Sequence, residues 1–552
     1  MKTEAFASPE PTIARRSHFA RATPSGQSVE QHSVRVRRPF DFVDSSALTL
    51  TSAPARPGIA GTSYDTAWLA SVPGDVAGTS RFPTALQWLV DHQYPDGSWG
   101  GHLRYEHDRI ISTLAALAPI AQFGRHSVDQ DAVAKGTRYL WTHSHLLRSE
   151  PLELVATELL LPALADRARK AGISVPPTMN VYTSQRAEKL RLIPLDALYS
   201  SQTTAAHSLE FLGDDADRAR LPRTLGANGG VGNSPAATAY YYAQTRDPRA
   251  LVYLENCRDE AGGIMVPVLS PCESFELLWS AYHLFLAGIP VERILTPAER
   301  SSIARKLRSG GVSLSDSFPI SDADDTAVAL TLLGDLDGPP QTEALQAFAM
   351  PDGHFASFPY ERHASVGVNL HVLQALARCR EYPDREATLD RTLRYVVSQQ
   401  IDEMYWLDKW HLSPYYATAH ALCCLRDLDP RRAKIAAPSL SGAREWIRAT
   451  QNSDGSWGFY GQSTAEETAY AVLALAASAS GTFDPMDWLC CNRGIAFLRA
   501  ALGADWSFDE TSYPELWIDK CLYVPSLVVQ SVIEAAFVAF ARHTGERGQK
   551  SA

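Results

Sequence analysis

From about residue 55 onward, apolar residues recur at three- and four-residue spacing, which is the pattern of amphipathic and buried helices. Residues 109–121, 273–288 and 467–478 are typical segments. Gly, Pro or Asp-Gly separates one such segment from the next, and few segments alternate with period two. We therefore expect an all-α fold, arranged as a curved or closed array of helical hairpins.

An internal repeat adds to this picture. "QYPDGSWG" at residues 93–100 returns as "QNSDGSWG" at residues 451–458, each time ahead of an apolar helix. Asp-Gly supplies a turn, Gln can bond to freed backbone groups at a neighbouring helix end, and Trp can stack over that junction. The repeat predicts two related helical units and favours a bracing role over a chemical one.

Composition narrows the class of protein. With 552 residues, 45% of them hydrophobic, and a formal charge of -11, the chain is long enough for two or three domains and lacks the basic balance of a nucleic-acid binder. We find no apolar run of the ~18 residues that a spanning helix needs. The adjacent cysteine pairs at 423–424 and 490–491, without CxxC spacing, indicate reduced thiols in a cytoplasmic protein.

The N-terminal segment, residues 1–50, differs from the rest. Its first ~40 residues are rich in Arg, Ser, Pro and Ala and show no helical apolar face, so we expect disorder there. An organelle transit peptide is an alternative, which Glu4, Glu10 and Glu30 weaken without excluding.

Three carboxyls stand together in "SDADDTAVAL", residues 321–330, directly before an apolar run. One reading is a helix cap, with Asp322 or Ser321 at the N-cap and Asp324 and Asp325 at the positive end of the macrodipole. The other is an acid catalyst, because like charges this close do not all ionise cheaply and one carboxyl then keeps its proton near neutral pH. The residues alone leave both readings open.

The DxDD pattern of Asp322, Asp324 and Asp325, together with "SYDTAW" at residues 63–68 and the two QxxDGSWG repeats, resembles the class II terpene cyclases of the copalyl diphosphate synthase type. The resemblance spans residues 60–530 and implies that Asp324 protonates the terminal alkene of a polyprenyl diphosphate while Asp322 and Asp325 orient and tune it. Rings then close in a cascade, and the diphosphate stays in the product.

The resemblance prefers geranylgeranyl diphosphate as substrate, giving a copalyl, labdane-type or halimane-type diphosphate. Farnesyl diphosphate, giving a drimenyl-type product, is the alternative within the same chemistry. An α-barrel carbohydrate-active or sugar-binding protein is the alternative from another class, although it calls for carboxyls on separate elements. No DDxxD motif for removing diphosphate is found, so a downstream class I terpene synthase or phosphatase is the expected partner.

Further residues follow from the resemblance. Lys189, in "EKLRLIP", matches a diphosphate-binding lysine, and Lys520, in "ELWIDKCLYVP", matches another basic position. Glu158 is a candidate ligand for the magnesium that accompanies the diphosphate. His207 stands where the plant-type enzymes have the histidine of a His/Asn base pair, but Val268 replaces the asparagine, which puts the ent product in doubt.

Aromatic side chains are expected along the cavity, where their faces stabilise carbocations. "MYWLDKWHLSPYYATAHAL" supplies Tyr405, Trp406, Trp410, Tyr415 and Tyr416. We expect one or two of them at the cavity and assign Trp406, Trp410 and Tyr415 to substrate binding.

The family also implies two α-barrel domains, called β and γ, with the γ domain inserted into the β domain. Here this gives a first part of β at 51–84, the γ domain at 85–287, and the main part of β, with DxDD, at 288–552.

Overall fold

Helices make up nearly all the regular structure of the chain. The computed structural model describes residues 58–550, apart from gaps at 335, 337–340, 359–360, 480–482 and 502–512. Within those residues the only strands are β1 (Trp517–Ile518) and β2 (Leu522–Tyr523), an antiparallel hairpin. The expected all-α class is confirmed, while the N-terminal segment 1–50 lies outside the described residues.

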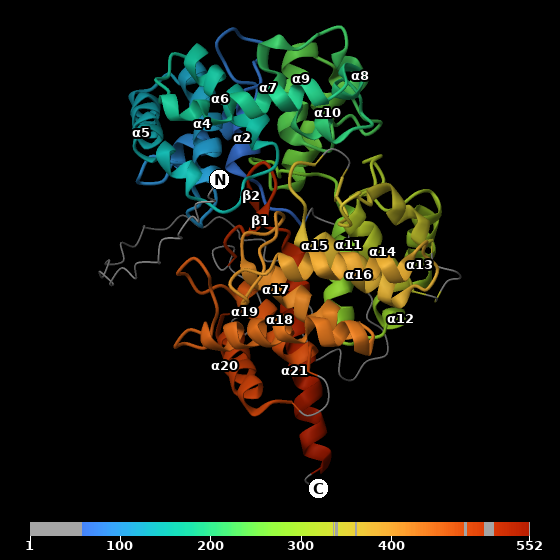
Figure 1. Cartoon of the computed structure of the whole chain (residues 1–552). Helices are drawn as coiled ribbons and strands as arrows, with labels where there is room; N and C mark the ends of the chain where they lie inside the picture. The colour runs from blue at the N-terminus through green and yellow to red at the C-terminus, as the bar shows by residue number, and fades with distance from the viewer. Residues whose placement is uncertain are drawn as a thin grey trace, which may run out of the picture. The chain divides into compact units, whose positions relative to one another are not determined.

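The C-terminal part of the chain forms a closed ring of inner helices, each packed against the next and the last against the first (Figure 1). In order around the ring these are α11 (Glu273–Leu286), α14 (Ala323–Leu333), α15 (Val366–Arg378), α17 (Pro414–Cys424), α19 (Ala465–Ala477) and α21 (Ser526–Lys550). Every residue of α14 and α17 is buried, as expected of helices that are surrounded on all sides.

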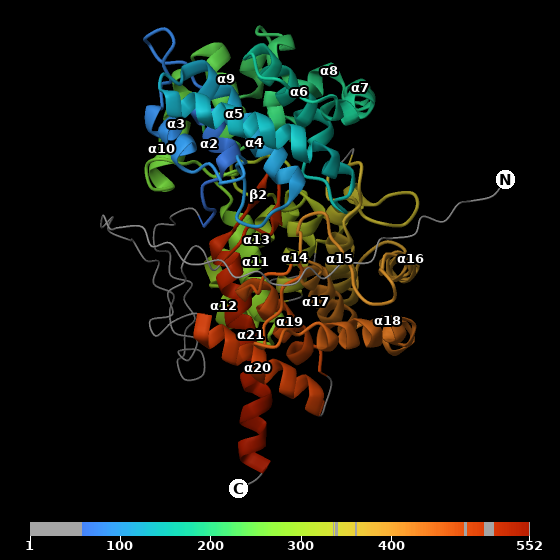
Figure 2. The same ribbon diagram turned by 90° about the vertical axis from the view of Figure 1, so that its left-hand side faces the viewer.

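Shorter or more polar helices cover the outside of this ring. They are α12 (Val291–Ile294), α13 (Pro297–Arg308), η5 (Thr342–Phe348), α16 (Arg385–Ser398), η6 (Leu425–Asp427), α18 (Pro430–Ala449) and α20 (Pro485–Ala501). Figure 2 shows α20 beside α21. The arrangement is an α-barrel whose core lies between the two layers.

A second ring is built from the N-terminal part of the chain. Its inner members are α2 (Ser63–Ala70), α4 (Glu106–Phe123), α6 (Thr157–Lys170), η3 (Thr204–Asp215) and α9 (Pro235–Thr245). Around them lie α3 (Pro83–Asp91), α5 (Ser127–His143), η1 (Ser144–Arg148), η2 (Pro177–Tyr182), α7 (Thr183–Leu192), α8 (Leu195–Leu198), η4 (Leu221–Thr224) and α10 (Pro248–Glu260). The expectation of two α-barrels is confirmed.

The boundaries between the rings differ from those expected at 84/85 and 287/288. Helix α2 packs against α4 and α9 in the N-terminal ring, and α11 packs against α14 and α21 in the C-terminal ring. The physical reason is that α2 is needed to close the N-terminal ring and α11 is needed to close the C-terminal ring. The chain therefore passes from the first ring to the second between α10 and α11. The insertion of one named domain into the other stays a prediction.

The repeated motifs are braces between outer helices. The indole N–H of Trp99 donates to the Leu89 carbonyl at the end of α3, and Trp457 does the same to Ile447 at the end of α18, both at 2.7 Å. Trp406 donates likewise to Val396 at 2.8 Å, which reveals a third copy of the brace. Orphan carbonyls at helix ends are thereby satisfied.

Helix α21 contains the one candidate membrane span among the described residues. Its stretch Ser526–His543 is long and apolar enough to cross a membrane, contrary to the sequence expectation, but 56% of it is buried inside the protein. It packs against α11 and α19 as a wall of the ring. We therefore assign it to the core of the C-terminal barrel.

Candidate active site

The three carboxyls meet at the first turn of α14, an inner helix of the C-terminal ring. Asp322 is the N-cap in an extended conformation, and its Oδ1 accepts a hydrogen bond of 2.7 Å from the backbone N–H of Asp325. The cap reading of the sequence was therefore correct for Asp322. Asp324 and Asp325 follow in the first helical turn, where the macrodipole favours acidic groups.

Burial sets the protonation of this group. Burial first, then the carboxyl of Asp325, raises the pKa of Asp322 well above its ordinary value. Burial first, then the carboxyl of Asp324, raises the pKa of Asp325 to about 7. Asp324 is the most accessible of the three, with 12% of its side chain exposed. Asp322 and Asp325 therefore hold protons near neutral pH, and Asp324 is the outermost of the three carboxyls.

A histidine that sequence reasoning missed contacts Asp324. His371, on α15, has its Nδ1 2.5 Å from Asp324 Oδ1 and its Nε2 3.1 Å from Nδ1 of His420 on α17. Both histidines are fully buried. The available signal was a single histidine in the middle of an apolar helical segment, at 366–376 and again at 414–424. No spacing along the chain connects either of them to the DxDD motif.

Aromatic rings surround the acid. The indole N–H of Trp279, on α11, donates to Asp325 Oδ1 at 3.2 Å. Its ring centre lies 5.0 Å from that of His371, 6.1 Å from Tyr416 and 5.9 Å from Trp517. Such faces stabilise positive charge in a desolvated site. Trp279 and Trp517 were not among the expected residues.

Ser357 and Trp410 connect the first turn of α14 to a group of basic side chains. The backbone carbonyl of Ser357 accepts from the N–H of Ala323 at 3.0 Å, while its hydroxyl accepts from the indole of Trp410 at 3.2 Å. The ammonium of Lys409 lies 4.5 Å from the centre of the Trp410 ring and pairs with Glu361. Of the three aromatic residues assigned to substrate binding, Trp410 is therefore the one that lies near the three carboxyls.

Basic groups from both rings gather here. Arg362 pairs with Glu153, which precedes α6 in the N-terminal ring. Burial, then the charges of Arg362, Lys409 and Lys189, lowers the pKa of His363, while Glu158 acts in the opposite direction. Lys189, half-buried on α7, therefore lies in the same electrostatic neighbourhood. We call Lys189, Arg362, His363 and Lys409 the basic cluster.

Comparison with known proteins identifies the family of this chain. Residues 361–541 match the model described as the squalene-hopene cyclase C-terminal domain. Over 511 residues the chain is 31% identical to the type B diterpene cyclase of Mycobacterium tuberculosis, covering 88% of this chain and 97% of that one. The chain belongs to the class II diterpene cyclases. The resemblance drawn from its motifs is confirmed.

Other class II diterpene cyclases agree with this assignment. The labda-7,13-dienyl diphosphate synthase of Streptomyces clavuligerus is 32% identical over 541 residues, covering 90% of this chain and 92% of that one. The solved ent-copalyl diphosphate synthase from Streptomyces platensis matches with a TM-score of 0.72 and 28% identity over 88% of this chain and 96% of that one. The similarity therefore extends over both rings.

Two expected cavity residues of this diterpene cyclase lie elsewhere. Trp406 is fully buried and serves as the third brace, and Tyr415, 2% exposed, stacks on Trp446 of the outer helix α18 with ring centres 4.6 Å apart. Both side chains face the layer between inner and outer helices. Trp406 lies in the segment before α17 and Tyr415 on α17, and neither side chain faces the three carboxyls, so their expected role in substrate binding gains no support from the structure.

Lys520 and His207 belong to a buried ionic network between the rings. Lys520, at the tip of the β1–β2 hairpin, donates to Glu210 Oε1 and the His207 carbonyl at 3.0 Å and to Ser234 at 2.5 Å. All three of its donors are used and it is fully buried, so it is not placed to meet a diphosphate. Asp65, in "SYDTAW", lies 3.9 Å away in the same network.

His207 has both ring nitrogens occupied, Nδ1 by the Gly232 carbonyl at 2.8 Å and Nε2 by Asp519 at 3.0 Å. Burial lowers its pKa, but the Asp519 carboxylate outweighs burial and leaves the pKa above its ordinary value. Two acceptors and a raised pKa indicate an imidazolium, which cannot take a proton. Both ring nitrogens of His207 are occupied by protein groups, so the structure lends no support to its expected role in deprotonation, which stays a prediction.

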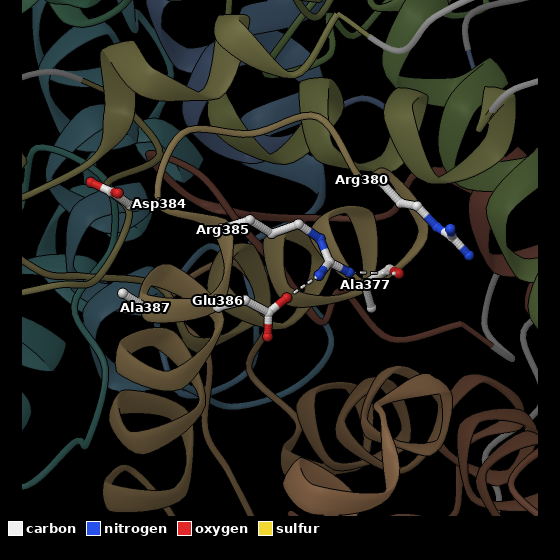
Figure 3. Close-up of a pocket in the computed structure, with 6 residues that line it drawn as sticks. All are labelled: Ala377, Arg380, Asp384, Arg385, Glu386 and Ala387. Atoms are coloured by element: carbon white, nitrogen blue, oxygen red, sulfur yellow. Dashed lines mark hydrogen bonds and ion pairs between the residues drawn. The ribbon is translucent and has the colours of Figure 1, made fainter.

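A surface hollow of about 720 Å³ lies away from this chemistry (Figure 3). Ala377, Arg380 and Arg385 contribute to its lining. Arg385 pairs with Glu386 at 2.5 Å and donates to the Ala377 carbonyl at 3.1 Å, so it caps the end of α15. We assign this hollow to helix capping, and none of the three carboxyls lines it.

Proposed function

We propose that the protein protonates the terminal alkene of geranylgeranyl diphosphate and cyclises it to a bicyclic copalyl, labdane-type or halimane-type diphosphate. The observation that carries this proposal is the group of three buried carboxyls at the start of α14, with Asp324 outermost. Relatives named copalyl and labda-7,13-dienyl diphosphate synthases support the twenty-carbon substrate.

The first step is a proton transfer from Asp324. The π electrons of the terminal alkene form a C–H bond with the carboxyl proton, leaving a tertiary carbocation and an Asp324 carboxylate. An alkene is a very weak base, so the acid must be strong and kept from water. Protonated Asp322 and Asp325 add no negative charge that would oppose the ionisation of Asp324.

The carbocation then moves along the folded chain as rings close. Trp279, Tyr416 and Trp517 offer aromatic faces around the acid, each worth ~1–2 kcal/mol to a desolvated cation. Trp410 extends this surface toward the basic cluster. Loss of a proton from carbon ends the cascade and forms the product alkene.

The diphosphate end is assigned to the basic cluster. Lys189, Arg362 and Lys409 supply positive charge there, while His363, whose pKa is lowered, offers a neutral ring for hydrogen bonding. A substrate that reaches from Asp324 to the basic cluster places its alkene at Asp324 and its diphosphate where the two rings meet. In this proposal the diphosphate binds the basic cluster, which includes Lys189, instead of the expected pair of Lys189 and Lys520.

We infer that magnesium would bind at the same junction as the diphosphate. Glu158 lies buried in the first turn of α6 and acts electrostatically on His363, which puts a carboxylate beside the basic cluster. Among the described residues no three His, Cys, Asp or Glu side chains form a metal cage, which suits an ion bound by one carboxylate and substrate phosphates. Bound Mg²⁺ would neutralise diphosphate charge, with Glu158 as its protein ligand.

The product keeps its diphosphate, so its consumer is an enzyme that ionises or hydrolyses allylic diphosphates. A class I terpene synthase or a phosphatase meets that requirement. All eight cysteines are free and buried, which supports a reducing compartment such as the cytoplasm.

The test is to incubate the wild type, Asp324→Ala and the isosteric Asp324→Asn with geranylgeranyl or farnesyl diphosphate and Mg²⁺. Products are dephosphorylated and identified by mass spectrometry, in H₂O and in D₂O. We expect a bicyclic twenty-carbon alcohol from the wild type, with one deuterium gained in D₂O, and a loss of about 10³-fold or more in both variants. Drimane alcohols alone would assign the farnesyl substrate, and linear alcohols from the wild type would contradict the proposal.

A further inference from the structure

A second histidine stands behind the one that holds the acid. His420 Nδ1 lies 3.1 Å from His371 Nε2, and His371 Nδ1 lies 2.5 Å from Asp324 Oδ1. The line runs from α14 through α15 to α17, and both histidines are 0% exposed. Each ring nitrogen of His371 therefore has a fixed partner, and the protonation of His420 decides what His371 can do.

An aspartic acid beside a histidine does not ordinarily remain an acid. With ordinary pKa values of about 3.9 and about 6.5, the histidine takes the proton and an ion pair results. The neutral pair and the ion pair contain the same two protons. They differ at His371 Nε2, which carries no hydrogen when Nδ1–H faces a protonated Asp324, and carries one in the imidazolium.

His420 is neutral. Burial first, then the neighbouring His371, His283 and His411, lowers the pKa of His420 well below its ordinary value. The groups that face it from the adjacent inner helices and the loop before α17 are otherwise uncharged rings. They are Trp279, Tyr282, Tyr416 and Tyr470. A neutral imidazole has one N–H, so His420 has one donor to place.

Hydrogen bonding decides where that donor lies. Among the described residues, His420 Nε2 has no hydrogen-bond partner, whereas Nδ1 faces His371. A buried N–H without an acceptor is rarer than an unpaired acceptor lone pair. The hydrogen therefore sits on Nδ1 of His420 and is donated to Nε2 of His371, which must be bare to accept it.

We propose that His420 is a positioning residue that holds His371 in its neutral Nδ1–H form and so keeps the catalytic proton on Asp324. The inference rests on the proposed function and deepens it. Asp324 Oδ1 accepts from His371, and the transferable proton is on Oδ2. When the alkene takes that proton, Oδ1 of the new carboxylate keeps its hydrogen bond from His371.

The experiment compares His420→Asn with His420→Asp, which have the same shape and opposite hydrogen-bonding capacity. The amide nitrogen of Asn is attached at the same carbon as Nδ1 of His and can donate to His371. An ionised Asp only accepts, which draws a hydrogen onto His371 Nε2 and favours the ion pair. We expect kcat within about fivefold of wild type for Asn and at least ~10²-fold lower for Asp, with KM unchanged in both.

A readout that does not depend on turnover completes the test. The infrared carbonyl band of the protonated acid, identified by its loss in Asp324→Asn, should persist in His420→Asn and disappear in His420→Asp. Circular dichroism checks folding. His420→Leu, which removes the donor without adding charge, provides the second variant and should lower kcat at least about tenfold.

Equal kcat values and equal infrared bands in His420→Asn and His420→Asp would overturn the proposal. So would full activity in His420→Leu. A wild type that makes no bicyclic alcohol would overturn the proposed function instead, and the infrared comparison would still decide whether His420 keeps the proton on Asp324.

Discussion

The three carboxyls of the DxDD motif show which roles of single residues can be predicted from sequence and which cannot. The cap reading of "SDADDTAVAL" is confirmed for Asp322, which caps α14, whereas the acid-catalyst reading stays a prediction that the raised pKa values of Asp322 and Asp325 support. The partners of the group were not predictable. His371 follows Asp324 by 47 residues, and only the closure of the ring brings α14 and α15 together.

At this scale we predict that Asp325→Asn stabilises the fold at alkaline pH. The pKa of Asp325 is about 7 in the folded protein and about 3.9 in an unfolded chain, so its contribution to stability is fully present below about pH 4 and is lost as pH rises to 7. Asn resembles the protonated acid and does not titrate. The expected gain is on the order of 1–3 kcal/mol at pH 8 and near zero at pH 4.

Urea unfolding of the wild type and Asp325→Asn at pH 4, 6 and 8 measures this effect. Cyclisation should fall at least about tenfold in the same variant, because Asp325 adjoins the acid. A gain in stability that does not change with pH would show that Asp325 is not the titrating group.

At the scale of elements, the brace shows what a short motif encodes. Gln93 donates to Gly97 and Ala132, and Gln451 donates to Gly455 and Cys490, each pair at 2.8–2.9 Å. The expected bonding of Gln to a neighbouring element was correct. The third copy escaped detection because Gln400 and Trp406 keep the contacts without the DGSWG letters between them.

The braces make a prediction that separates stability from catalysis. Gln451→Leu removes two part-buried hydrogen bonds, one to the Gly455 carbonyl in the turn after α18 and one to the Cys490 carbonyl of α20, so the free energy of unfolding should fall by about 1–2 kcal/mol. Because the brace lies in the outer layer, kcat should stay within about twofold of wild type. Gln93→Leu, in the other ring, is the matched variant, and a large loss of kcat in either one would contradict a purely structural role.

At the scale of the whole molecule, the hairpin β1–β2 explains why the rings act together. It lies between α20 and α21 in the chain and contacts the N-terminal ring, where Asp519 pairs with His207 and the N–H of Leu522 donates to Asp108 at 2.9 Å. The motifs at either end of the chain were recognisable in the sequence. Their use as an ionic junction was not, since charge pairing over more than 300 residues leaves no local periodicity.

The last prediction uses two lysines that the sequence could not tell apart. Lys520→Met leaves the Glu210 and Asp65 carboxyls buried without their cation, which should cost about 3–5 kcal/mol of stability. Lys189→Met, in a half-buried position on α7, should cost less stability than Lys520→Met and raise KM for the diphosphate substrate at least tenfold. Thermal unfolding and steady-state kinetics on both variants measure the two effects.

The opposite results would contradict the assignment of Lys189 to diphosphate binding and of Lys520 to stability. If Lys520→Met were as stable as wild type and had a raised KM, the junction would have to open and offer Lys520 to the substrate. If Lys189→Met bound substrate normally, the diphosphate would rest on Arg362, His363 and Lys409 alone. Because Lys520 has all its donors satisfied by buried protein groups and Lys189 belongs to the basic cluster, we expect the loss of stability in Lys520→Met and the loss of affinity in Lys189→Met.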